Sequence, residues 1–185
     1  IIAKYSRIDV IVNNAGILRD KSFAKMTSSQ WKPVDEIHLL ATWRICKAAW
    51  PHMQRQKYGR IINTASAVGL YGNFGQANYS SAKAGIWGLS NSIALEGAKY
   101  NIKVNVIAPN AGTAMTATIL DQKTVEILCP SFVSPLVTLL GSEKCPCTGK
   151  VIEVGSGWHA AVRWQRSKGE FFESFDLPSI QAGWK

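Results

Sequence analysis

The chain has 185 residues, of which 46% are hydrophobic, and its 21 Lys and Arg residues exceed its 12 Asp and Glu residues, giving a formal net charge of +9. This length and composition predict one domain with a packed core and exclude a disordered chain. No run approaches the ~20 apolar residues that span a bilayer, and the four cysteines lack metal-site spacing. We therefore expect neither membrane insertion nor a bound metal.

The positive charge indicates either a solvated basic surface or an affinity for a polyanion. The lysines are scattered along the chain, which favours a solvated surface for most of them. No nucleic-acid-binding motif is present, so we expect no nucleic-acid partner. An anionic lipid or a phosphate-rich small molecule remains as the ligand class that this charge would attract.

The first third of the chain predicts a strand followed by a long helix. Residues 1–7 have the character of a helix end, and residues 8–12 have the apolar pattern of a buried strand. A helix is expected over residues 28–56, with Ser28 as its cap and an interruption near Pro33. Its apolar stripe faces either the core or another subunit, and the pattern does not decide between these. The stripe consists of Ile37, Leu40, Trp43, Ile45, Ala48 and Ala49.

The middle of the chain predicts a strand, a loop and a helix that carry titratable side chains. Residues 61–64 have the pattern of a strand, and Ser66 follows at its carboxyl end, where open α/β sheets bind ligands. The helix expected over residues 76–99 carries Tyr79 and Lys83 four residues apart, hence on one face. An ammonium beside a phenol favours the phenolate and lowers the pKa of the phenol. The pair predicts a proton-transfer site in which the Ser66 hydroxyl holds a substrate oxygen.

Three glycines lie between Ser66 and Tyr79, and we expect Gly69, Gly72 and Gly75 to form turns.

The last third of the chain predicts the end of the sheet. The elements expected there are a buried parallel strand at 102–108, short helices at 121–129 and 132–140, and a final strand at 150–155. The pattern fades after Trp164. We therefore assign residues 1–168 to one partial domain and residues 169–185 to a linker.

Two motifs, in this order, resemble those of the short-chain dehydrogenase/reductase family. Asn13-Asn14-Ala15-Gly16 follows the strand at 8–12, and Ser66, Tyr79 and Lys83 come later with thirteen residues from Ser66 to Tyr79. A Tyr-x-x-x-Lys pair alone arises readily by chance, whereas the combination is specific. The resemblance implies an α/β fold with a Rossmann-like, doubly wound parallel sheet, represented here by its C-terminal part. It also implies a nicotinamide cofactor, which we take to be NAD.

The resemblance implies a role for each of several residues. The catalytic set is Ser66, Tyr79, Lys83 and His38, and the cofactor-binding set is Asn13, Ala15, Gly16, Tyr79, Lys83, Ala111, Gly112 and Thr113. Tyr79 would be the acid/base, Lys83 would bind the nicotinamide ribose, and Ser66 would orient the substrate oxygen. His38 departs from the family pattern, in which an asparagine holds a proton-relay water. Asn110 departs from it too, because a glycine is usual there.

The same resemblance predicts a segment that precedes the strand at 8–12. The family binds the cofactor pyrophosphate with a glycine-rich loop after its first strand, and no such loop stands before residue 8. We expect an N-terminal segment of the same polypeptide to supply it. The residue that separates NAD from NADP belongs to that segment as well. In the family the helices at 28–56 and 76–99 pair with those of a second copy, which implies a homodimer.

A narrower likeness is to the members of the family that oxidise (3R)-hydroxyacyl-CoA in the peroxisomal β-oxidation of fatty acids. It rests on the segments at residues 16–23, 57–62 and 70–80. It implies an acyl-CoA substrate and a peroxisomal location. Two alternatives stay open. One is the same chemistry on a steroid or an acyl-carrier-protein ester, and the other is a truncated, non-catalytic interaction module.

Overall fold

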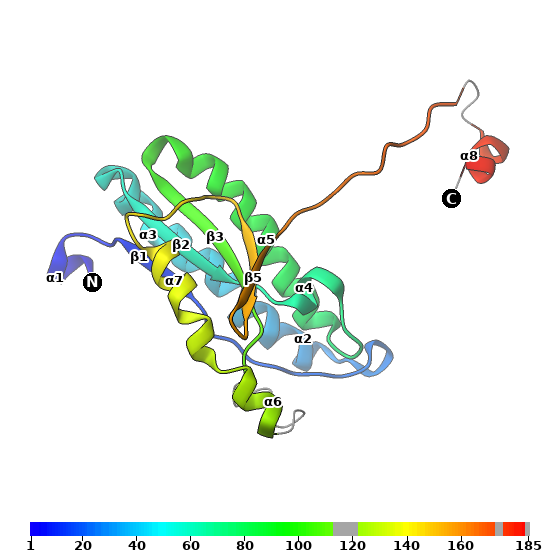
Figure 1. The fold of residues 1–185 in the computed structure, drawn as a ribbon, viewed down its shortest axis with the longest axis horizontal. Helices are drawn as coiled ribbons and strands as arrows, with labels where there is room; N and C mark the ends of the chain where they lie inside the picture. The colour runs from blue at the N-terminus through cyan, green and yellow to red at the C-terminus, as the bar shows by residue number, and fades with distance from the viewer. Residues whose placement is uncertain (113–121, 173–175, 184–185) are drawn as a thin grey trace.

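The protein is built around a five-stranded sheet of order β1-β2-β3-β4-β5 (Figure 1). The computed structural model describes residues 1–112, 122–172 and 176–183. The strands are β1 (Val10–Asn13), β2 (Gly59–Thr64), β3 (Ile102–Pro109), β4 (Val151–Gly155) and β5 (Trp158–Val162). Strands β1 to β4 run parallel, and β5 pairs with β4 in the antiparallel direction. Every residue of β2 is buried, as expected for a parallel strand covered on both faces.

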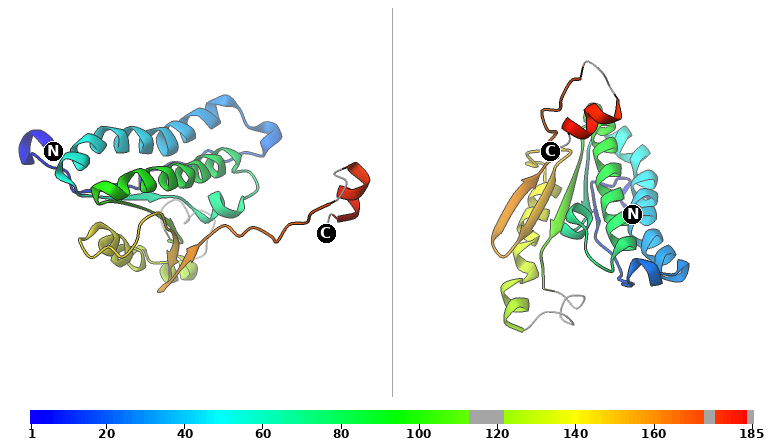
Figure 2. Two further views of the ribbon diagram at one scale, coloured as in Figure 1. Left: turned by 90° about the horizontal axis from the view of Figure 1, so that it is seen from above. Right: turned by 90° about the vertical axis from the view of Figure 1, so that its right-hand side faces the viewer.

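Two long helical rods cover one face of the sheet (Figure 2). The first runs without a break through α2 (Ser28–Asp35), the π-helical turn η2 (Glu36–Leu40) and α3 (Ala41–Gln56), and the second is α5 (Ala77–Gly97). Between these rods and the sheet lies a core cluster that includes Ile11, Met53, Ile61 and Val104. Thr27, and not Ser28, caps the first rod, with the Thr27 N–H donating to Gln30 Oε1 at 3.0 Å.

The other face of the sheet is covered by the segment between β3 and β4. It contains α6 (Gln122–Ile127), the 3₁₀ turn η4 (Pro130–Phe132) and α7 (Ser134–Gly141). Leu140 of α7 belongs to a second core cluster with Ile62, Ile107 and Val154. The mostly parallel sheet with helices on both faces confirms the predicted α/β, Rossmann-like fold.

Short elements complete the described chain. They are α1 (Ile2–Tyr5), η1 (Phe23–Lys25), α4 (Ala67–Tyr71), η3 (Ala98–Tyr100) and α8 (Leu177–Gly183). After β5 the chain leaves the sheet as an extended segment that leads towards α8 (Figure 1). Near its start Trp164 stacks on Trp87 of α5, with ring centroids 4.6 Å apart and planes inclined by 5°. That contact holds the beginning of the extended segment against α5.

Besides the Ser28 cap and the interruption near Pro33, which the continuous first rod lacks, two further predictions about local structure are wrong. The strand at 151–155 is not the last, because β5 follows it after a turn at Ser156 and Gly157. Gly69 does not form a turn, since it lies inside α4, where an added Cβ would stand 2.6 Å from Lys83 Cβ. Its role is to let α4 approach α5. Gly72 and Gly75 do form turns, with φ of 78° and 79°, in the left-handed region that glycine adopts without strain.

A buried polar network joins β1, β2 and α5 beneath the first rod. Asn13 Nδ2 donates to Asn63 Oδ1 at 2.8 Å, Asn63 Nδ2 donates to Ser90 Oγ at 2.9 Å, and Ser90 Oγ donates to the Ile86 carbonyl at 2.7 Å. Since Asn63 is fully buried, each of these partners removes a desolvation cost of about 1–3 kcal/mol. The network therefore fixes the register of α5 against β1 and β2.

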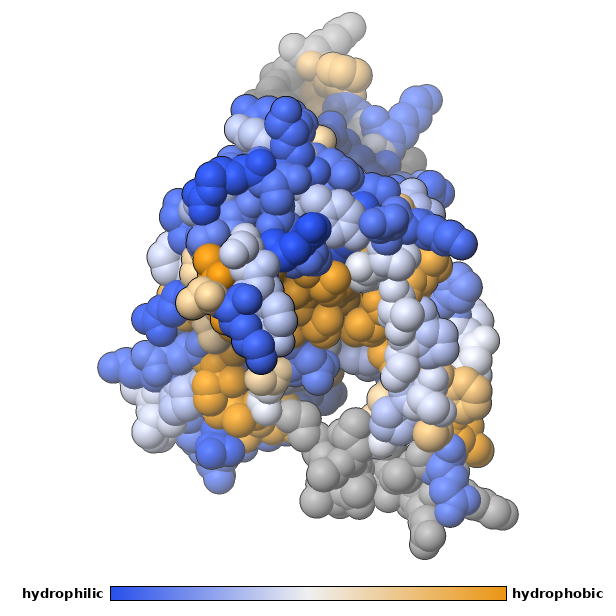
Figure 3. Space-filling view, turned by 90° about the vertical axis from the view of Figure 1, so that its left-hand side faces the viewer, coloured by the Kyte–Doolittle hydropathy of each residue, from blue (hydrophilic) through white to orange (hydrophobic). Residues whose placement is uncertain are grey.

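Strand β1 lies at one edge of the sheet and, among the described residues, pairs with β2 alone. Val10 and Val12 are 42% and 46% exposed. Both project towards the face that α7 covers, because a Cβ on Gly141 of α7 would lie 3.3 Å from Val10 and side chains alternate along a strand. Figure 3 views the molecule from the side on which α1 lies in Figure 1 and shows apolar surface in a hollow at its centre. An apolar open edge favours pairing with another strand.

We predict that the chain of residues 1–185 self-associates through this edge and that Val12→Lys reduces the self-association several-fold. A lysine at an open edge disfavours strand pairing, because its ammonium loses water when another chain docks. Sedimentation velocity of the purified chain measures the associated fraction. Leu95→Lys is the matched control, since Leu95 is an exposed apolar residue of α5. An equal effect of the two substitutions would contradict a role for the β1 edge.

Candidate active site

Ser66, Tyr79 and Lys83 meet at the carboxyl end of β2. Lys83 lies one helical turn after Tyr79 on α5, and its Nζ is 5.5 Å from the centroid of the Tyr79 ring. The ammonium donates a hydrogen bond of 2.6 Å to the carbonyl of Thr64, the last residue of β2. Ser66 is the N-cap of α4, its Oγ accepts from the Val68 N–H at 3.2 Å, and its side chain lies near enough to the Tyr79 phenol to lower the pKa of that phenol. The structure thus brings together three residues that the sequence predicted as one site.

Burial dominates the electrostatics of this group. Lys83 is only 3% exposed, and burial lowers the pKa of its ammonium to about 8. Burial also raises the pKa of the Tyr79 phenol, which the nearby Ser66 hydroxyl lowers and the charge of Asp20 raises. The predicted lowering of the Tyr79 pKa by Lys83 is therefore wrong for this structure. The ammonium is directed to the Thr64 carbonyl, and burial is the largest influence on the pKa of the phenol.

His38 lies beside Tyr79 inside the π-helical turn η2. The two rings meet edge to face, with centroids 5.1 Å apart and planes at 89°. His38 Nε2 is 2.8 Å from the Ile17 carbonyl oxygen and 3.0 Å from the Ile17 nitrogen. Burial lowers the His38 pKa, the Lys83 charge lowers it further, and the bond to Ile17 raises it. The imidazole is thus held neutral next to the phenol, at a helical irregularity of the kind often found at functional sites.

His38 Nδ1 is buried and, within the described residues, has no hydrogen-bond partner. An unpartnered buried nitrogen is costly and indicates a place for a polar ligand atom or a water molecule. Whether His38 takes part in a proton relay stays a prediction. Its position is nevertheless fixed, because a Cβ on Gly16 would stand 2.2 Å from His38 Cε1. Gly16 is therefore required by the imidazole that packs on it.

The other predicted cofactor residues lie at two places along the strand ends. The Asn13 side chain is engaged inside the sheet by Asn63, whereas Ala15 is exposed. Gly112 N–H donates to the Leu128 carbonyl at 2.6 Å, which holds the segment of Ala111 and Gly112 close to the end of α6. Thr113 lies outside the described residues.

Asn110, the second departure from the family pattern, is accommodated by close backbone packing. Its N–H donates to the Val154 carbonyl at 2.8 Å, so it extends the pairing of β3 with β4. Gly155 allows this approach, because an added Cβ there would lie 2.2 Å from the Asn110 carbonyl oxygen. The segment predicted to meet the nicotinamide is thus anchored at the carboxyl end of the sheet.

Sequence reasoning missed two amides that position Tyr79. Asn78 is buried, and its Nδ2 donates to the carbonyls of Arg19 and Gln30, both at 3.0 Å. Its Oδ1 accepts from the Tyr79 N–H at 2.8 Å, in the first turn of α5, where the N–H groups lack helical partners. Gln76, the N-cap residue, donates to Asp20 at 2.9 Å. Polar residues directly before Tyr79 at a helix start were the only available signal.

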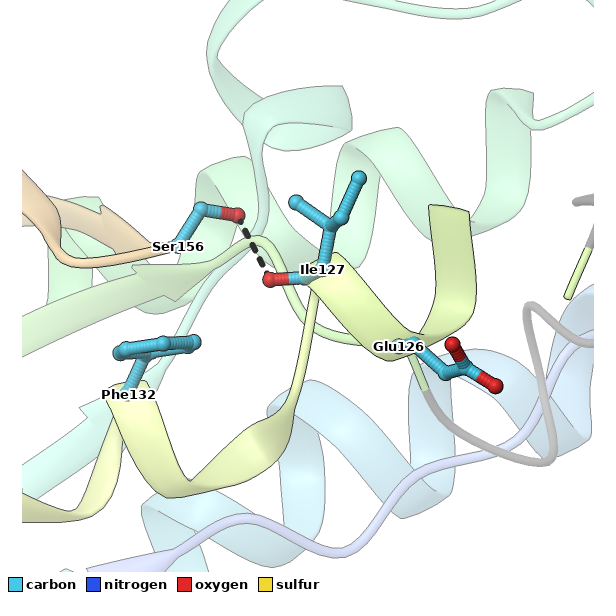
Figure 4. A pocket seen from close by; sticks show the side chains of 4 residues that line it. All are labelled: Glu126, Ile127, Phe132 and Ser156. Carbon is cyan, nitrogen blue, oxygen red and sulfur yellow. Dashed lines mark hydrogen bonds between the residues drawn. The ribbon is translucent and has the colours of Figure 1, made fainter. Parts of the chain in front are cut away.

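A separate hollow lies beyond the end of β4 (Figure 4). It is lined by Glu126, Ile127, Phe132 and Ser156, and the Ser156 hydroxyl donates to the Ile127 carbonyl at 3.2 Å. None of the predicted catalytic residues lines it.

Among residues 1–112, 122–172 and 176–183, no three His, Cys, Asp or Glu side chains are grouped to hold a metal ion. No helix in the described part of the chain is long and apolar enough to cross a membrane.

The parallel sheet and the Ser66, Tyr79 and Lys83 group at its carboxyl edge define a short-chain dehydrogenase. The chain belongs to that family, whose model, described as short chain dehydrogenase, matches residues 1–124. Members of this family are oxidoreductases that generally use NAD or NADP.

Individual relatives place the chain within the family. It is 58% identical over 179 residues to the peroxisomal hydratase-dehydrogenase-epimerase of Neurospora crassa, covering 96% of this chain and 20% of that protein. It is 40% identical to the acetoacetyl-CoA reductase of an Acinetobacter species, covering 84% of this chain and 67% of that protein. The solved full-length peroxisomal multifunctional enzyme type 2 of Drosophila melanogaster matches with a TM-score of 0.84 and 39% identity, covering 92% of this chain and 32% of that one. The chain thus spans about a fifth of its Neurospora relative.

We predict that Gly16→Ala destabilises the fold by about 1–3 kcal/mol, the usual cost of overpacking. The added methyl would meet the His38 ring at 2.2 Å and displace it from Ile17. Urea unfolding measures the free energy of unfolding. Gly88→Ala in α5 is the control, because an added Cβ there meets no atom within 4 Å and should stabilise the helix by up to ~1 kcal/mol. Equal free energies of unfolding for the two variants would show that the His38 ring moves aside without a measurable cost in stability.

We also predict that the stability of the wild type, relative to Lys83→Met, rises between pH 8 and pH 10.5. The folded-state pKa of about 8 lies below the ordinary value of 10.5, so burying the ammonium is costly below pH 8. Between pH 8 and pH 10.5, Lys83 is largely deprotonated in the folded state but still protonated in the unfolded state. The cost of burying the ammonium therefore falls over this range, by on the order of 3 kcal/mol. Denaturant unfolding across this range tests the prediction, with Lys47→Met as control, since Lys47 is an exposed residue of α3. A difference in unfolding free energy between wild type and Lys83→Met that does not change with pH would contradict it.

Proposed function

We propose that residues 1–168 are the catalytic part of an NAD-dependent dehydrogenase domain that oxidises (3R)-hydroxyacyl-CoA to 3-ketoacyl-CoA in peroxisomal fatty-acid β-oxidation. Residues 169–185 form a linker in this proposal. The observation that carries it is the convergence of Ser66, Tyr79 and Lys83 at the carboxyl end of β2, where the Lys83 ammonium is 5.5 Å from the centroid of the Tyr79 ring and donates to the Thr64 carbonyl. The names of the Neurospora and Drosophila relatives support the peroxisomal setting, and the name of the Acinetobacter reductase supports an acyl-CoA substrate.

The proton chemistry follows from the positions of the two hydroxyls. The substrate 3-hydroxyl lies against Tyr79 and Ser66, and Ser66 orients its oxygen. In the oxidation Tyr79 acts as a phenolate base and takes the hydroxyl proton, whereas in the reverse reduction the neutral phenol gives that proton to the ketone oxygen. Because burial raises the Tyr79 pKa, the neutral phenol prevails near pH 7. The oxidation rate should then rise with pH as the phenol ionises.

A nicotinamide, when bound, accepts the hydride that leaves the substrate carbon. The residues present fit that group. Within the described residues, Lys83 donates to the Thr64 carbonyl, so two of its three N–H donors remain for sugar hydroxyls. Asn13, Ala15 and Gly16, together with Ala111, Gly112 and Thr113, would border the nicotinamide end. We propose that a glycine-rich loop in a preceding segment of the same polypeptide binds the pyrophosphate.

The outer face of the first rod supports a homodimer in this proposal. Ile37, Trp43 and Ile45 are apolar and more than a third exposed on η2 and α3. Large apolar side chains gathered on one helical surface favour a protein contact over solvent exposure. A second copy that packs its own α3 and α5 against this rod would cover them.

We predict that Tyr79→Phe lowers turnover at least 10²-fold while the fold stays intact, since the change keeps the ring and removes the proton-transferring group. Nicotinamide absorbance in the complete polypeptide, with a 3-hydroxyacyl-CoA as substrate, measures the rate, and urea unfolding measures the stability. Tyr71→Phe is the matched control, because Tyr71 is the last residue of the neighbouring helix α4 and its hydroxyl donates to Glu153 at 2.8 Å. Near-normal rates in a stable Tyr79→Phe variant would remove Tyr79 from the mechanism.

A further inference from the structure

Two surface loops lie against each other at the end of the molecule that holds Tyr79. They comprise residues 19–25 and residues 72–76 and are called the loop pair here. The Lys21 N–H donates to the Gly75 carbonyl at 2.8 Å, and Gln76 Nε2 donates to Asp20 Oδ2 at 2.9 Å. Asn78, next to Tyr79, holds the Arg19 carbonyl. The loop pair is therefore fixed to the first turn of α5.

Each loop presents an aromatic ring to solvent. Phe23 is 78% exposed and Phe74 is 90% exposed, so both rings are almost wholly in solvent. Phe23 is two residues from Lys21 and Phe74 is next to Gly75, the residues whose backbones join the loops. Neither ring contributes to a core cluster of the described chain. Their exposure indicates that they serve a contact with another molecule.

The loop pair is also basic. Arg19, Lys21 and Lys25 are exposed, and Asp20 is the one acidic residue among residues 19–25. Asp20 accepts a hydrogen bond from Gln76, so its carboxylate is already engaged. Guanidinium and ammonium groups bind phosphate oxygens, and exposed aromatic rings stack on nucleobases. The combination suits a ligand that carries both a base and several phosphates.

We propose that the loop pair binds the phosphorylated adenosine end of coenzyme A, with Phe23 and Phe74 against the adenine and Arg19, Lys21 and Lys25 on the phosphates. This inference rests on the proposed function and adds the subsite that recognises the carrier of the acyl group. Phe74 is five residues from Tyr79, hence at most about 18 Å along the chain. The pantetheine arm of coenzyme A can bridge such a separation and place the thioester near Tyr79.

An anionic lipid surface or an acidic protein could also meet basic loops with exposed rings. The attachment of the loop pair to α5 favours coenzyme A. The loops are bonded through Gln76 and Asn78 to the helix start that positions the phenol. A small molecule that reacts at Tyr79 must pass over this surface, whereas membrane docking would not require such bonds.

The test measures binding of free coenzyme A, dephospho-coenzyme A and pantetheine to the full chain by calorimetry, without nicotinamide. The variants are Phe23→Ala with Phe74→Ala, and Lys21→Gln with Lys25→Gln. Their controls are Leu95→Ala and Lys144→Gln, which change an exposed apolar residue and an exposed lysine elsewhere. We expect each loop variant to bind coenzyme A about tenfold more weakly, the scale of one stacking contact, while pantetheine binding and both controls stay unchanged.

Dephospho-coenzyme A should bind more weakly than coenzyme A to the wild type, and the lysine variant should lose that preference. Equal coenzyme A affinity in wild type and both loop variants would overturn the proposal. So would wild-type affinity for coenzyme A no greater than for pantetheine, or loop-dependent sedimentation with phosphatidylserine vesicles in place of coenzyme A binding. Because no turnover is measured, a failure of the dehydrogenase proposal would appear separately, as bound coenzyme A without oxidation of a 3-hydroxyacyl-CoA.

Discussion

The hydrogen bond from the buried Lys83 ammonium to the Thr64 carbonyl is the contact on which the site depends. A buried charge is tolerated only where polar partners replace water, and here the partner is a backbone carbonyl at the end of β2. The bond therefore holds α5 over that strand end at one rotation and one height. Tyr79, one turn earlier on the same helix, is directed to the same place. The burial that makes the contact costly also sets the unusual pKa values of both side chains.

Small residues and buried amides surround this contact and make its geometry unique. Gly69 lets α4 lie against the backbone of Lys83, and this brings the Ser66 hydroxyl to the phenol. Asn63 ties β1 and α5 to the central sheet, and Asn78 ties the start of α5 to two loops. Each amide is a buried polar group that is stable only with its partners in place. Alternative packings of α5 would leave those groups unsatisfied.

Three of the apolar regions on the surface matter for contacts with other molecules, because the packing of the described chain leaves them uncovered. They are the β1 edge at Val10 and Val12, the outer face of η2 and α3 at Trp43, and the loop pair at Phe23 and Phe74. Their settings differ physically. The edge offers unpaired backbone groups, the rod offers a helical surface, and the loop pair combines rings with cations. These differences match a strand, a helical partner and a phosphorylated small molecule respectively.

The sequence alone determined those features that depend on local spacing. Tyr79 and Lys83 share a helical face because they are four residues apart, and the buried strand β3 follows from a continuous apolar run. Only the tertiary structure revealed β5, whose half-exposed edge position gives its residues a weak apolar pattern, and the roles of Gly69 and Asn78. It also decided the direction of the Tyr79 pKa. That direction depends on how much water the surrounding elements remove from the phenol, and residue spacing carries no information about desolvation.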